Sequence, residues 1–136
     1  SSSDDENFFS RIYKVHVNGV SVLITGDITE EGEDALIRMY RGTGKLKADI
    51  LKVAHHGSRY SSSQAFIDEV EPLIAVIQVG RNNYGHPSQS VIEKLESSGI
   101  IVYRTDLDGA VGIKAEEEKI RECTQKSMLS EDFRTT

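Results

Sequence analysis

Residues 50–57 read Ile-Leu-Lys-Val-Ala-His-His-Gly, and this stretch is the most informative part of the sequence. Its largely apolar first part is typical of a buried strand, and it ends in two imidazoles followed by a glycine. Histidine is the side chain best suited to metal binding and proton transfer near neutral pH. Three of the four histidines, His55, His56 and His86, lie in predicted loops, whereas His16 lies within a strand pattern. The clustering predicts a metal-dependent or acid–base enzyme.

A hairpin and a helix are predicted before this stretch. Residues 12–17 and 20–25 are apolar-rich strands, and the Asn18-Gly19 pair between them favours the positive φ angles of a type I′ turn. Thr29 then begins a helix as its N-cap. The helix has apolar residues at helical spacing, namely Ala35, Leu36 and Met39.

The chain continues to alternate strands with helices after residue 47. A strand is predicted at 48–54, an almost wholly apolar strand at 73–79, and short strands at 100–103 and 110–113. One of the serines at 61–63 can cap a helix that carries Phe66, Ile67 and Val70, and a further helix is predicted over 88–98. The alternation indicates an α/β fold, with a mixed sheet and helices packed on it.

The length of 136 residues fits one domain. We expect a flexible start at residues 1–9, a folded part at 10–114, and a polar helical or partly disordered tail at 115–136. No apolar stretch approaches the ~20 residues of a membrane span, so a soluble domain is expected.

The charge distribution limits the possible partners. A formal net charge of −6 disfavours a wholly electrostatic nucleic-acid binder. Four cationic residues nevertheless lie near the double histidine in sequence, with only Asp49 opposing them. A locally positive site of this kind could accept phosphate, and the alternative is that these residues are scattered over the surface. The four are Lys45, Lys47, Lys52 and Arg59.

The candidate functional residues each follow a separate predicted strand: Asp27, the His55-His56 pair and His86. They should therefore meet at one edge of the sheet. A carboxylate and several imidazoles form a ligand set suited to zinc or manganese. The alternatives are structural: Asp27 as a turn or helix cap, the two adjacent histidines as a hydrogen-bonded pair, and His86 as a helix-entry residue.

Four segments together resemble the metallo-β-lactamase-fold domain of the ComEC competence proteins, over about residues 12–114. They are Thr-Gly-Asp at 25–27, Ala-Asp-Ile-Leu-Lys-Val-Ala-His-His-Gly-Ser at 48–58, Val-Gly-Arg-Asn-Asn-Tyr-Gly-His-Pro at 79–87 and Tyr-Arg-Thr-Asp-Leu-Asp-Gly-Ala at 103–110. The resemblance implies an αββα sandwich with two divalent metal ions at its edge.

The resemblance also implies roles for individual residues. Asp27 would bridge the two metal ions and His86 would be the last histidine ligand. His55 or His56 would protonate the leaving group, and the motif leaves open which of them does so. The residues expected to bind substrate are Ser58, Arg59 and Asn83.

The family's main metal-binding signature, His-x-His-x-Asp-His, is absent from this chain. The chain therefore resembles only the C-terminal half of the sandwich. The resemblance implies a metal-dependent phosphodiesterase or nuclease acting on DNA during competence-related uptake. The parent protein would be a bacterial membrane protein with this domain outside the cytoplasm. The N-terminal half of the domain and the membrane channel portion would be its partners.

For this chain alone we expect no catalytic activity and no metal, or only weakly bound metal, because two ligands do not complete a catalytic site. A missing half would expose apolar surface, which a homodimer or the C-terminal segment could cover. Two other functions remain open: a non-catalytic DNA-binding or assembly module, and a metallo-hydrolase of the same fold acting on another phosphoester or a lactone.

Overall fold

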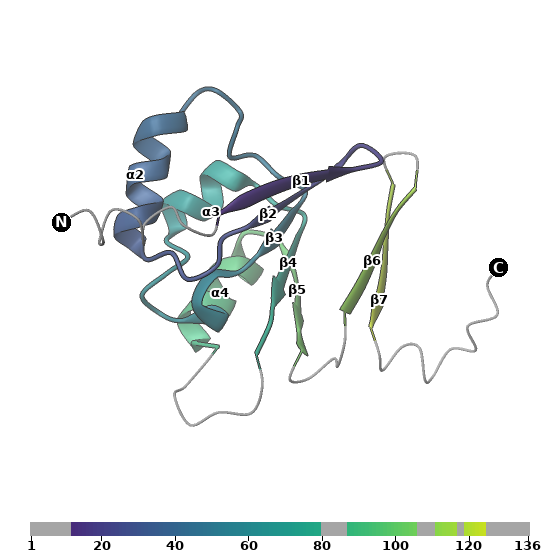
Figure 1. The fold of residues 1–136 in the computed structure, drawn as a ribbon. Coiled ribbons are helices and arrows are strands. Elements are labelled where there is room, and N and C mark those ends of the chain that lie inside the picture. The colour runs from purple at the N-terminus through teal and green to yellow at the C-terminus, as the bar shows by residue number, and fades with distance from the viewer. Residues whose placement is uncertain (1–11, 80–86, 106–110, 117–118, 125–136) are drawn as a thin grey trace.

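A five-stranded mixed sheet, in the order β1-β2-β3-β4-β5, forms the centre of the molecule (Figure 1). The structure is a computed structural model that describes residues 12–79, 87–105, 111–116 and 119–124. β1 is antiparallel to β2, and the other neighbouring strands are parallel. The strands are β1 (Tyr13–Val17), β2 (Val20–Ile24), β3 (Ile50–Lys52), β4 (Ile74–Ile77) and β5 (Ile101–Arg104). The predicted α/β fold with a mixed sheet is confirmed.

The β1–β2 hairpin has the predicted turn. Asn18 and Gly19 have φ angles of 48° and 79°, as a type I′ turn requires, and Val17 pairs with Val20 across it. Since the residues of a strand point alternately to its two faces, this register determines which hairpin side chains face the helices.

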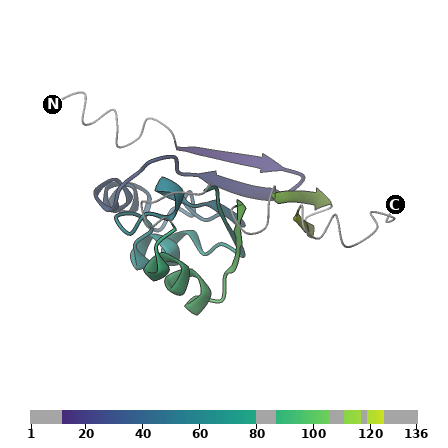
Figure 2. The same ribbon diagram turned by 90° about the horizontal axis from the view of Figure 1, so that it is seen from below.

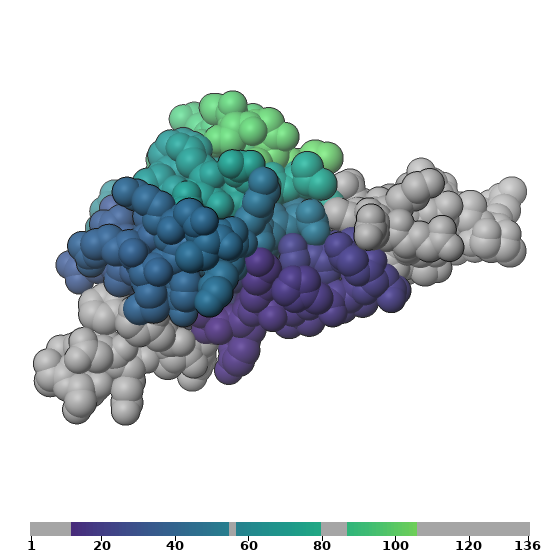
Figure 3. All heavy atoms as spheres, turned by 90° about the horizontal axis from the view of Figure 1, so that it is seen from above, coloured from purple at the N-terminus to yellow at the C-terminus, as the bar shows by residue number. Residues whose placement is uncertain are grey.

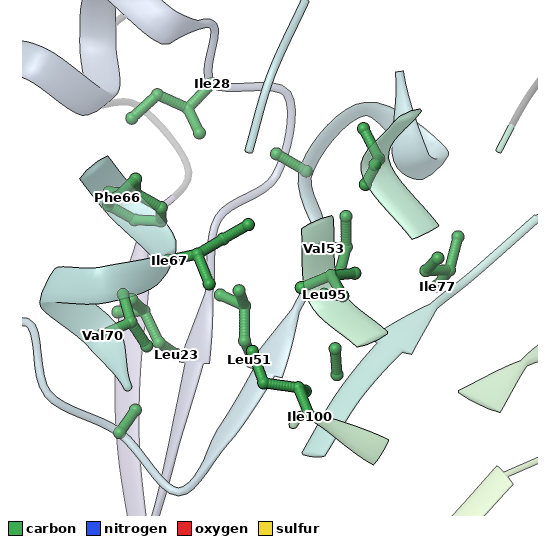
Figure 4. Packing of buried hydrophobic residues seen from close by; sticks show 14 of the residues in the cluster. Leu23, Ile28, Leu51, Val53, Phe66, Ile67, Val70, Ile77, Leu95 and Ile100 are labelled. Atoms are coloured by element: carbon green, nitrogen blue, oxygen red, sulfur yellow. The ribbon is translucent and has the colours of Figure 1, made fainter. Parts of the chain in front are cut away.

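The helices α2 (Glu30–Tyr40), α3 (Gln64–Val70) and α4 (Gln89–Ser97) lie on one side of the sheet (Figures 1 and 2). Their apolar residues pack against the sheet's side chains to form the main core (Figure 4). Among the fully buried members are Leu23, Leu51, Phe66, Ile67 and Leu95. No described helix is both long and apolar enough to cross a membrane.

The helix caps follow the sequence. Thr29, Ser63 and Ser88 are the N-cap residues of α2, α3 and α4, and the Ser63 side chain accepts a hydrogen bond from the Phe66 backbone N–H. Gly99, with φ of 77°, follows α4. This conformation favours glycine after a helix.

Two apolar residues of the predicted helix and strand are exposed. Met39 is 57% exposed, whereas Ile37 packs in the core, because the buried face of α2 runs through Glu33, Leu36 and Ile37. Leu73 is 59% exposed because β4 begins one residue later, at Ile74. The apolar interior strand itself is confirmed, since β4 lies between β3 and β5.

The helix predicted from residue 115 is wrong for the residues that the structure describes there. β6 (Val111–Glu116) and β7 (Lys119–Thr124) form a separate antiparallel hairpin. Val111, Ile113 and Ala115 recur at a spacing of two in the sequence, the period of a strand. That short alternation and the cross-strand pairing outweigh the helix-favouring composition. Residues 125–136 lie outside the described part.

The sheet face opposite the helices carries a second apolar cluster. Val20, Ile50 and Ile74 are buried in it, whereas Tyr13, Val15 and Val17 of the edge strand β1 are exposed. The apolar surface that the sequence predicts is therefore present on this face.

Candidate functional site

Asp27 and the histidine turn lie at the same edge of the sheet. β2 and β3 are parallel neighbours, with Ile24 opposite Lys52, so their carboxyl ends are adjacent. Asp27 follows β2, and the 3-10 turn η1 (Ala54–Gly57), which contains both adjacent histidines, follows β3. The Thr25 hydroxyl donates a hydrogen bond of 2.8 Å to the Lys52 carbonyl and joins the two strand ends.

A pocket of about 330 Å³ opens at this edge. Among the described residues that line it, Asp27 is the only carboxylate and Lys52 the only cation, and Gln78, which follows β4, also contributes. The Asp27 side chain is exposed and makes no hydrogen bond to another described residue. Capping of the turn or of α2 by Asp27 is therefore not seen, and its carboxylate is available to a ligand.

The histidine turn packs against the residue that follows His86. Gly57 has φ of 82°, and a Cβ built on it would lie 2.5 Å from the Pro87 Cβ atom. The Ser88 backbone N–H also donates a hydrogen bond of 2.7 Å to the Gly57 carbonyl. His86 itself lies outside the described residues, but its chain neighbour contacts the turn that contains His55 and His56.

Thr105 holds Val79, the residue that precedes the segment 80–86. Its hydroxyl accepts a hydrogen bond of 2.8 Å from the Val79 N–H and lies 2.9 Å from the Val79 carbonyl, to which it donates. Both residues that flank 80–86 are thus tied to the fold close to the carboxyl edge.

Glu33 is a buried carboxylate that the sequence pattern did not single out. It holds the serine loop, residues 61–63, which follows the histidine turn. Glu33 is 0% exposed and accepts hydrogen bonds from the backbone N–H groups of Ser62, at 2.6 Å, and Ser63, at 2.9 Å. Desolvation raises the pKa of Glu33, although both of these hydrogen bonds and one from the Ser63 side chain oppose the shift. Its spacing of three and four residues from Leu36 and Ile37 was the available signal of burial.

Two of the expected substrate-binding residues have structural contacts. Ser58 is 5% exposed, and its hydroxyl oxygen accepts a hydrogen bond of 3.3 Å from the Tyr60 N–H. Arg59 is exposed; its Nη2 atom donates to the Tyr60 hydroxyl at 2.7 Å, and its guanidinium lies 4.9 Å from the ring centroid. Asn83 lies outside the described residues. Substrate binding by all three stays a prediction.

The expected cluster of four cations around the histidines is wrong. Lys52 lines the pocket beside Asp27, but Lys47 forms an ion pair of 3.4 Å with Glu71, and Lys45 lines a different pocket. Both of these lysines precede β3 in the chain. They therefore lie toward the edge of the sheet where β3 begins, which is opposite the edge that carries Asp27. Asp49, at the edge where β3 begins, accepts hydrogen bonds from the N–H and hydroxyl of Ser21.

The described residues supply only part of a metal site. No group of three His, Cys, Asp or Glu side chains that could hold an ion occurs within the described ranges. Asp27 is the one ligand of the expected set whose side chain the structure places. Its exposed carboxylate at the pocket suits a hard or borderline cation, but it does not make a site alone.

No protein-family model matches the chain. The chain is, however, similar to competence proteins. It is 38% identical over 107 residues to ComE operon protein 3 of Bacillus subtilis, which covers 78% of this chain. It is 36% identical over 124 residues to competence protein ComA of Neisseria gonorrhoeae, and 33% identical over 116 residues to recombination protein 2 of Haemophilus influenzae. Each of these two matches covers 85% of this chain.

These relatives are much longer than the chain. The matched region makes up 13% of ComE operon protein 3, 18% of ComA and 14% of recombination protein 2. The chain is thus homologous to one small segment of each competence protein.

Proposed function

We propose that this chain is part of a metal-dependent phosphodiesterase domain that acts on DNA during competence-related uptake. One observation carries the proposal: Asp27 and the histidine turn follow adjacent strand ends, and Asp27 lines a pocket there together with Lys52. The similarity to competence proteins supports the biological setting.

Each residue at this edge has a role that its chemistry allows. Asp27 and His86 would hold divalent metal ions, zinc or manganese, which lower the pKa of bound water and neutralise phosphate charge. Lys52 places a positive charge in the same pocket and would attract a phosphodiester. His55 or His56 would give a proton to the departing oxygen.

The remaining ligands would come from the N-terminal half of a metallo-β-lactamase-like sandwich. Its sheet would cover the apolar face that carries Tyr13, Val15 and Val17, which are now exposed. In the longer protein, this domain would lie outside the cytoplasm, next to the membrane channel portion. The isolated chain could instead cover the same face by forming a homodimer.

The substitution Asp27→Asn in the full-length natural protein tests the proposal. We expect metal-dependent hydrolysis of DNA and of a simple phosphodiester to fall by roughly 100-fold or more. The loss of a residue that only hydrogen-bonds to a metal ligand already lowers metal affinity or activity by about 10- to 100-fold. Asp34→Asn, an exposed carboxylate on α2, is the matched control and should keep full activity.

Two results would count against hydrolysis at this edge. Unchanged turnover of both substrates by Asp27→Asn would refute the role of this residue. DNA binding by the natural protein without hydrolysis under any divalent cation would favour the alternative, a non-catalytic DNA-binding or assembly module. Hydrolysis of a lactone or another phosphoester, but not of DNA, would change the substrate class alone.

A further inference from the structure

A second pocket, of about 540 Å³, lies between β1 and α2 on the helix side of the sheet. Figure 3 shows the β1–β2 hairpin in purple beside the blue segment that contains α2 and the residues after it. The apolar part of the pocket includes Leu23, Leu36 and Leu46, which belong to the main core. No described residue lines both this pocket and the pocket at Asp27.

The polar residues of this second pocket are basic. Lys14, His16 and Lys45 line it, and none of the described residues that line it is a carboxylate. The Lys14 ammonium donates a hydrogen bond of 3.0 Å to the Lys45 carbonyl, and the Lys45 ammonium lies 5.6 Å from the Tyr40 ring centroid. Neither ammonium is in an ion pair with a described residue. Positive charge beside apolar side chains favours an occupant that is both acidic and apolar.

The strand that borders this pocket is also an edge of the sheet. β1 pairs only with β2 among the described strands. In a two-residue hairpin the closing pair, here Val17 and Val20, exchanges both backbone hydrogen bonds. Such pairs alternate along an antiparallel ladder, so the backbone N–H and C=O groups of Lys14 and His16 point away from β2. An extended segment can pair with these outward groups.

We propose that β1 and this pocket together bind an extended acidic segment of a partner protein. The segment would pair with the outward backbone groups of Lys14 and His16. On its helix-side face, an apolar side chain would enter the pocket between two carboxylates that lie near Lys14 and Lys45. Residues of one face recur every second position, so the segment would read acidic-x-apolar-x-acidic. The site is independent of hydrolysis at Asp27.

A fluorescent peptide containing Asp-Val-Leu-Val-Asp is the probe, and fluorescence anisotropy at low salt measures its binding to this chain. We expect saturable binding that falls by roughly 2- to 30-fold in the double variant Lys14→Ala, Lys45→Ala, the range for two exposed ion pairs. Met39→Glu, at an exposed residue of the pocket, should weaken binding as well. Lys47→Ala is the matched control and should bind as the unmodified chain does.

Two modified peptides test the geometry. A peptide with Lys in place of both Asp residues should bind more weakly, and one with N-methylated backbone amides on its pairing edge should not bind. Circular dichroism of each protein variant verifies that it is folded.

Several outcomes would overturn the proposal. These are no saturable binding of the Asp peptide, equal binding of the Lys or N-methylated peptide, or binding unaffected by the double variant. Binding of dodecanoate without binding of the peptide would assign the pocket to an anionic amphiphile. Light scattering that shows a dimer of this chain, dissociated by Met39→Glu, would assign the edge to a second copy.

Discussion

Gly57 is the residue of the histidine turn that packs against Pro87, and two physical effects require glycine there. Its φ of 82° disfavours any side chain, and Pro87 occupies the space of a Cβ atom. Gly42 has a similar φ of 79° but no atom within 4 Å of a built Cβ. A comparison of substitutions at Gly57 and Gly42 therefore separates the free-energy cost of backbone strain from that of steric overlap.

We predict that Gly57→Ala is more destabilising than Gly42→Ala. The left-handed conformation should cost each variant roughly 1–2 kcal/mol, and overpacking should cost Gly57→Ala a further ~1–3 kcal/mol. Denaturant unfolding gives both free energies. Equal losses would mean that the contact with Pro87 does not constrain the turn.

Glu33 gives the stability a dependence on pH. Because burial raises its pKa in the folded chain above the ordinary value, the folded chain binds the proton more tightly than the unfolded chain does. The stabilisation is fully present below the ordinary value and is lost as the pH rises through the folded pKa.

We predict that Glu33→Gln is destabilising by roughly 1–3 kcal/mol, because its amide NH2 would face a backbone N–H of Ser62 or Ser63. The difference in unfolding free energy from the unmodified chain should be larger at about pH 4 than at about pH 7. Glu31→Gln, at an exposed position, should show no such trend. A difference that grows with pH would show that the folded pKa is not raised.

At the scale of elements, the helices α2 and α3 differ in their N-caps. The Ser63 side chain caps α3 through the Phe66 N–H at 3.2 Å, whereas Thr29 makes no side-chain cap bond to α2. We predict that Ser63→Ala lowers the unfolding free energy by about 1 kcal/mol and Thr29→Ala by less.

Thermal or denaturant unfolding of the two variants, side by side, measures the effect of the Ser63 cap. Since Ser63 also donates its backbone N–H to Glu33, and alanine keeps that donor, any loss reports on the hydroxyl, which contacts both the Phe66 N–H and Glu33. Equal losses in both variants would contradict the assignment.

At the scale of the whole molecule, the incomplete ligand set predicts weak metal binding by this chain. Asp27, His86 and one of the adjacent histidines would give at most a partial site, and imidazoles must lose their protons before they ligate. We expect loose zinc or manganese binding that disappears below about pH 6.

Calorimetric titration with zinc measures this affinity. His86→Ala should abolish the weak binding, whereas His16→Ala, in the separate pocket beside β1, should leave it unchanged. Tight stoichiometric binding would reveal a complete site in the chain. Binding unaffected by His86→Ala would place the metal elsewhere.

The local structure could be predicted from the sequence. Asn18-Gly19 specified its turn, Ser63 its helix cap and Gly99 its helix end, because these features depend on one residue's φ angle or on a hydrogen bond within one turn of the chain. The common edge of Asp27 and the histidine turn was also predictable, since parallel strands end on the same side. The strand pairing of residues 111–124 was not, because a short alternation of apolar residues competed with a helix-favouring composition.

Which distant groups come into contact depends on the packing of the elements. Burial of Glu33 against the serine loop, contact of Gly57 with Pro87, and separation of Lys52 from Lys45 and Lys47 all depend on how elements cross the sheet. Because these lysines are close in sequence, one basic cluster was predicted. Strand β3, however, begins after Lys47 and ends at Lys52, which places them at opposite edges of the sheet. Charge proximity and burial are properties of packing, and a local pattern does not contain them.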